Sequence, residues 1–84
     1  MIDIAKTLSG TIRDRIPDAT ISIPGDGAIM VGGRDELLMF QIRGSQLIVP
    51  SWVYNRNVFR STYDLANQED LEQFVSSVKL ALES

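Results

Sequence analysis

The side chains best suited to recognising a ligand gather between Trp52 and Arg60. This stretch contains the chain's only tryptophan, one of its two tyrosines, Tyr54, and two arginines, Arg56 and Arg60. Trp, Tyr and Arg are the residue types enriched in protein-binding hot spots. Aromatic rings beside arginines also stack bases on open sheets that bind single-stranded nucleic acid. The stretch therefore favours a binding surface, with packing in the core or in a dimer as the structural alternative.

Catalytic groups are scarce, because the chain has no histidine and no cysteine. A Ser–His–Asp arrangement cannot form, and the commonest metal ligand is missing. The only two lysines lie on expected helices with no nucleophile motif beside them. The acidic neighbours Asp35–Glu36 and Glu69–Asp70 suit turn solvation and helix capping better than joint acid–base work, since adjacent side chains diverge. We expect no enzyme, no cofactor, no metal site and no evident small-molecule substrate.

Glycines cluster in two places, Pro24–Gly27 and Gly32–Gly33. A phosphate-binding loop needs a helix after the glycines, whereas strand-like residues follow both clusters here. The glycines are therefore interpreted as hairpin turns, in which glycine supplies the positive φ that such turns need.

Apolar residues recur at helical spacing at both ends of the chain. The pattern predicts a helix over residues 2–16, ended by Pro17, and a second amphipathic helix after Asn67. Asn67 is a good N-cap, and Asp70 three residues later resembles the acidic member of a capping box.

The middle of the chain consists of short β-rich runs between tight turns. The runs are residues 20–23, 28–31, 37–43, 47–53 and 58–63. Such short connections predict an antiparallel meander, because parallel strands need long crossovers. Pro50 cannot donate to a strand ladder, so the fourth run is expected at an edge or with a bulge.

These elements predict one small α+β domain over residues 1–84. Each helix has a single apolar face, so both are expected on the same face of a four- to five-stranded sheet, as a two-layer sandwich. The element order is similar to that of some type III secretion chaperones, immunity proteins and anti-CRISPR proteins. This likeness is one of topology and acidity without a shared motif, so it carries no residue assignments.

The other sheet face would then be open. If Leu38 and Phe40 pack under the helices, then Met39 and its alternate neighbours in the third run face the other way. The fourth run is apolar on both parities. Within so short a chain, we expect another protein or a second copy to cover that face.

Charge is unevenly distributed. The net charge of −3 divides into a balanced segment 1–19, a segment 20–63 with a net of +1, and a segment 64–84 with a net of −4. The acidic last helix is interpreted either as a solvated face or as a surface that meets a basic partner. A sequence pI near 4.7 gives no overall attraction to phosphate backbones, so we do not expect nucleic acid as the partner.

The leading hypothesis is a small cytoplasmic protein-interaction module with an adaptor, inhibitor, immunity or chaperone-like role. No signal peptide is expected, because Met1 to Lys6 lacks a basic region before an apolar stretch. No membrane-spanning run is expected either, because no stretch approaches the roughly 18–20 apolar residues that a span needs. The alternative is a nucleic-acid-binding or regulatory module that uses Arg34 with other arginines and aromatic residues. The candidate binding residues are Met39, Gln41, Arg43, Trp52, Tyr54, Arg56, Arg60, Glu69, Asp70 and Glu72.

Overall fold

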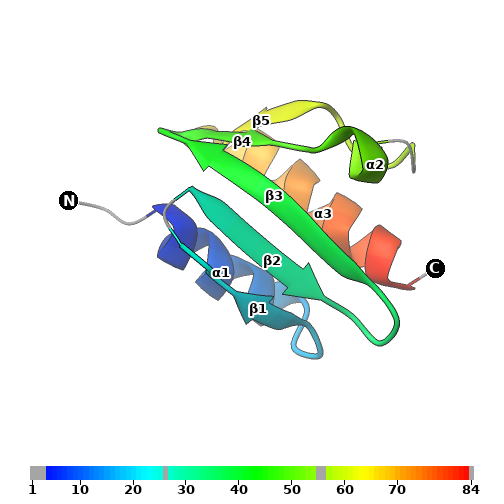
Figure 1. The fold of residues 1–84 in the computed structure, drawn as a ribbon. Helices are drawn as coiled ribbons and strands as arrows, with labels where there is room; N and C mark the ends of the chain where they lie inside the picture. The colour runs from blue at the N-terminus through cyan, green and yellow to red at the C-terminus, as the bar shows by residue number, and fades with distance from the viewer. Residues whose placement is uncertain (1–3, 26, 55–56, 84) are drawn as a thin grey trace.

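The computed structural model describes residues 4–25, 27–54 and 57–83 of the chain. Along the chain, one long helix precedes and another follows a series of short strands and one single-turn helix (Figure 1). In chain order the elements are α1 (Ile4–Arg15), β1 (Thr20–Ser22), β2 (Ala28–Gly32), β3 (Leu37–Arg43), β4 (Gln46–Ile48), α2 (Ser51–Tyr54), β5 (Thr62–Asp64) and α3 (Gln68–Glu83).

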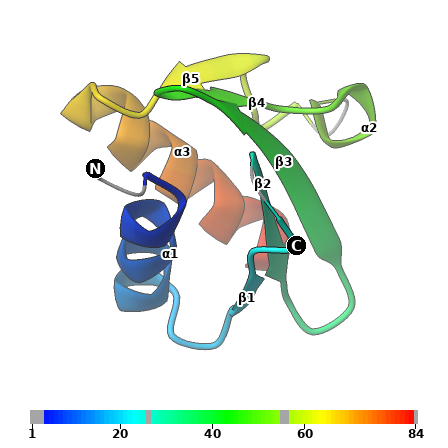
Figure 2. The same ribbon diagram turned by 60° about the vertical axis from the view of Figure 1, so that its left-hand side comes forward.

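The five strands form one antiparallel meander in the order β1-β2-β3-β4-β5. Helices α1 and α3 both lie on the concave side of the twisted sheet, as Figure 2 shows, which leaves the other face uncovered by a long helix. The expected two-layer α+β sandwich is therefore confirmed, with five strands. No helix in the part of the chain that the structure describes is long and apolar enough to cross a membrane.

The core lies between the sheet and the two long helices, and aromatic rings fill its centre. Phe40 of β3 contacts Phe74 of α3 edge to face, with ring centroids 4.9 Å apart, and Phe59 at 5.5 Å. Tyr63 of β5 adds a fourth ring, 5.3 Å from Phe74. Aromatic pairs at these separations stabilise a core beyond the area they bury. The alternation predicted for the third run places Leu38 and Phe40 in this core, as expected.

The start of α3 is fixed by Asn67. Its Oδ1 atom accepts hydrogen bonds from the backbone N–H groups of Glu69 and Asp70, at 2.9 and 3.2 Å, so the predicted N-cap is confirmed. The reciprocal half of the capping box differs from the prediction. The Asp70 carboxylate accepts from the backbone N–H of Asp64 instead, at 2.9 Å, because β5 ends directly beside this first turn.

Two predicted strands are shorter than the sequence pattern suggested. The run 47–53 pairs only as far as Ile48, and Ser51–Tyr54 turns into a helix. Pro50 has no N–H to continue the ladder, while its carbonyl accepts from Val53 N at 3.0 Å and closes a helical turn. The run 58–63 contributes only Thr62 and Tyr63 to β5, although Phe59 is still buried.

Candidate functional site

The uncovered face of the sheet is built mainly on β3. Four side chains of this strand point to it: Leu37, Met39, Gln41 and Arg43. Leu37 is 54% exposed and Met39 is 41% exposed, whereas Leu38 and Phe40, which alternate with them, are fully buried. Since successive residues of a strand point to opposite faces, this alternation identifies the open face directly. We call these four side chains the β3 face.

Neighbouring strands extend the β3 face sideways. The register places Met30 of β2 opposite Met39, and Ile48 of β4 opposite Gln41, both on the open side and both half-buried. Arg43 pairs in register with Gln46, so the polar side chains gather at one end of the strand. The half of the β3 face that holds Leu37 and Met39 is thus apolar, and the half that holds Gln41 and Arg43 is polar, with one cation.

Sequence reasoning had not included Met30 in the candidate set. The register could have identified it, because β2 and β3 are joined by the four residues 33–36, and Gly33 N donates to Glu36 O at 2.8 Å. A hairpin closed in this way fixes which residues of the two strands lie side by side.

Trp52 lies in α2 and not on a strand, so the alternation that places Met39 does not apply to it. Its side chain is 52% exposed, while the next residue, Val53, is fully buried and attaches α2 to the core. Tyr54 is the last residue of α2, and its side chain lies outside the part of the chain that the structure describes, as does all of Arg56.

Arg60 is directed toward the helices and does not join Met39 on the β3 face. Its guanidinium lies 4.6 Å from the centre of the Tyr63 ring and 2.9 Å from an Asp70 carboxylate oxygen. The Asp64 N–H, and then Arg60, hold the pKa of the Asp70 carboxyl below its usual range. Arg60 and Asp70 had been expected on two different surfaces, and the structure pairs them with each other.

Glu72 is also paired within the chain. Arg15, the last residue of α1, donates to both of its carboxylate oxygens, at 2.6 and 2.7 Å. This bidentate contact is the main reason that the pKa of Glu72 is lowered. Four acids of the last helix, Glu69, Asp70, Glu72 and Glu83, were predicted as a recognition surface. The carboxylates of Glu69 and Glu83 have neither a hydrogen bond nor an ion pair to another described residue.

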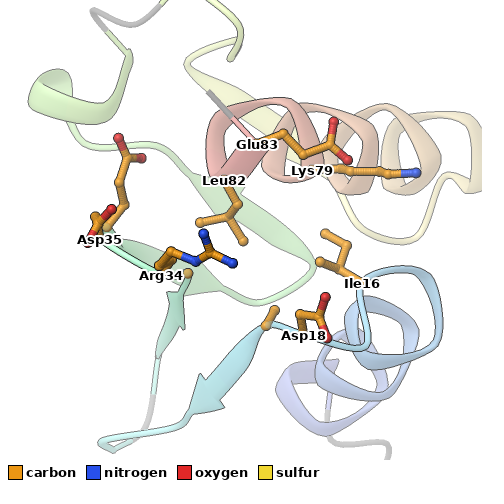
Figure 3. Close-up of a pocket in the computed structure, with 10 residues that line it drawn as sticks. Ile16, Asp18, Arg34, Asp35, Lys79, Leu82 and Glu83 are labelled. Atoms are coloured by element: carbon orange, nitrogen blue, oxygen red, sulfur yellow. The ribbon is translucent and has the colours of Figure 1, made fainter.

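Two cavities that the sequence did not predict lie among the described residues. One, of about 460 Å³, lies where the loop before β1, the turn between β2 and β3, and the end of α3 meet (Figure 3). The other, of about 540 Å³, lies beside β5 and α3. Within the described ranges, no cluster of acidic residues is arranged to hold a metal ion. Every buried side-chain polar atom in those ranges has a hydrogen-bond partner.

Comparisons with protein families, curated proteins and solved structures find no significant match for this chain.

Proposed function

We propose that this protein is a small non-enzymatic interaction module of the cytoplasm, and that its β3 face binds another protein or a second copy of the chain. The observation that carries the proposal is the exposure of Leu37 and Met39, on the middle strand of a sheet face that neither long helix covers. Half-exposed apolar side chains side by side on one face are typical of interaction surfaces.

The neighbouring strands support the same assignment. Met30 lies beside Met39 in register and Ile48 lies beside Gln41, so a partner would contact a strip of apolar side chains from β2, β3 and β4 that Gln41 interrupts. Burying apolar surface contributes about 25 cal/mol per Å², so such a strip supplies affinity without any charged contact. Methionine also adapts its shape to a partner, because its side chain is unbranched and polarisable.

The positions of the arginines favour a protein partner over nucleic acid. Arg43 lies at one end of the β3 face, Arg34 lies at the opposite end of β3, before its first residue, and Arg60 is paired with Asp70. Single-stranded nucleic acid needs several cations along one groove, together with stacking rings. A nucleic-acid role would therefore have to rely on separated cations in an acidic protein.

A site-specific crosslinking experiment tests the proposal. A photoreactive amino acid is placed at position 39, and a control is placed at Leu80, which is 57% exposed on α3. We expect a discrete product at position 39 that disappears in a Leu37→Asp background, and none at position 80. Crosslinking of purified protein reports a second copy, whereas a product that needs an added extract reports a different protein, which is then identified by its mass.

Equal products at positions 39 and 80, or a product that survives Leu37→Asp, would exclude the β3 face as the interface. A titration with labelled single-stranded oligonucleotide at low and high salt tests the alternative. Only nucleic-acid binding predicts an affinity that falls steeply with salt, because binding to phosphates releases counterions.

A further inference from the structure

The cavity of about 460 Å³ is lined by six charged residues, and Asp18, Arg34, Lys79 and Glu83 among them make no ion pair within the described part of the chain. Arg34 and Asp18 face it from two different loops, and Lys79 and Glu83 lie at its rim on α3. This differs from the other end of α3, where Asp70 is held by an arginine. Oppositely charged groups that share one cavity without pairing leave positions for a ligand that carries both signs.

Figure 3 shows how Arg34 and Asp18 are arranged. The Arg34 side chain extends from the turn between β2 and β3, beneath Leu82, toward the side of the cavity that Ile16 and Asp18 form. Lys79 runs along α3 away from Arg34, and Asp18 lies across the gap. Asp35 and Glu36 also line the cavity, but they follow Arg34 directly in the same turn. Asp18 is the acid across the gap, so Arg34 and Asp18 are placed to bind opposite ends of one small molecule.

The surface between these two charges is apolar. Ile16, Ala19 and Leu82 line it, and all three are half-buried against the core. Leu82 is seated directly on Gly33, where an added Cβ atom would lie only 2.8 Å from its Cδ2 atom. The close approach of α3 to this turn thus depends on Gly33. That approach in turn sets the shape of the apolar wall of the cavity.

We propose that this cavity binds a small zwitterion, an aliphatic amino acid or short peptide. Arg34 binds its carboxylate through paired N–H donors, which suit the planar geometry of that group. Asp18 accepts hydrogen bonds from its ammonium group, and the aliphatic part lies against Ile16 and Leu82. The volume falls within the range of about 300–1,000 Å³ that ligand pockets occupy. This site is separate from the β3 face and does not depend on the function proposed for it.

The test is an NMR titration of the full ¹⁵N-labelled chain with L-leucine and with L-leucyl-L-leucine. These two probes distinguish a free amino acid from a peptide, and saturable shifts confined to the amides around the cavity are expected with at least one. Two analogues that each keep a single charge, 4-methylpentanoate and 3-methylbutylamine, should bind at least about tenfold more weakly, because each leaves one charged hydrogen-bonding group unmatched.

The variants Arg34→Gln and Asp18→Asn should each weaken binding about tenfold, since each removes one charge-assisted contact. Arg13→Gln is the matched control, because it removes an exposed arginine of α1 that lies outside both the cavity and the β3 face. The amide spectrum of each variant reports whether the fold is retained. The proposal is overturned if a singly charged analogue binds as well as the zwitterion, if Arg34→Gln binds as well as the unchanged chain, or if neither probe produces saturable shifts by about 10 mM.

Discussion

Adjacent residues of β3 should respond very differently to truncation. Phe40 is fully buried and contacts the rings of Phe59 and Phe74, whereas Met39 is 41% exposed on the open face. Replacing Phe40 by leucine keeps an apolar side chain but removes both ring pairs. Each such pair contributes about 0.5–1.5 kcal/mol, so the free energy of unfolding should fall by about 1–3 kcal/mol. Met39→Ala should change it by no more than about 0.5 kcal/mol.

Leucine is chosen because the domain is small. At about 0.05–0.15 kcal/mol per residue, 84 residues give a total stability of about 4–13 kcal/mol. Phe40→Ala, at about 3–5 kcal/mol, could unfold the chain, whereas Phe40→Leu leaves a folded state to measure.

The assay is urea unfolding followed by circular dichroism. With a slope of about 1 kcal/mol per M, the midpoint should move down by about 1–3 M for Phe40→Leu and by less than about 0.5 M for Met39→Ala. A shift by one residue in the pairing of β3 would exchange the two faces. A larger loss for Met39→Ala than for Phe40→Leu would therefore refute both the register and the identity of the open face.

Three further predictions concern the helices and their contacts. Gly10→Ala should raise the free energy of unfolding by about 0.5–1 kcal/mol, because no atom lies near the added methyl group. Gly33→Ala should lower the urea midpoint instead, because its methyl group would clash with Leu82 of α3. Asn67→Ala should cost about 1 kcal/mol in the same assay through loss of the N-cap. The pKa values of Asp70 and Glu72 are lowered in the folded chain, so the unfolded chain binds more protons. The stability that these two carboxylates contribute is therefore complete above about pH 4–5 and is lost as the pH falls through their folded-state pKa values. Urea midpoints measured against pH should fall less on acidification in the double variant Asp70→Asn, Glu72→Gln than in the unchanged chain.

Local patterns were sufficient to predict most of the fold. The spacing of apolar residues predicted both long helices and the meander, and the alternation of Leu38 and Phe40 with Met39 predicted which face of β3 is open. These features depend on periods of about 3.6 and 2 residues, which any window of the sequence reveals. The strand predicted through Pro50 failed because a proline carbonyl can begin a helical turn as readily as the missing N–H can end a ladder.

The charged contacts could not be predicted in this way, because they depend on how elements meet. Arg15 and Glu72 are 57 positions apart in the sequence, and only the approach of α1 to α3 makes them a pair. The cavity between Arg34 and Asp18 likewise forms only where the end of α3 reaches two separate loops.

The ion pairs of Asp70 and Glu72 change which kind of partner the acidic last helix is expected to bind. A helix with many acids suggests a surface for a basic partner, yet Asp70 and Glu72 already bind arginines of the same chain. A partner that used these acids would have to compete with geometrically well-placed internal contacts, and exposed ion pairs yield little net affinity in exchange. The apolar side chains Leu37 and Met39 face no such competition, because about half of each is exposed and neither is held by an ion pair. Association through the β3 face should therefore depend only weakly on salt, in contrast to association through the acidic helix.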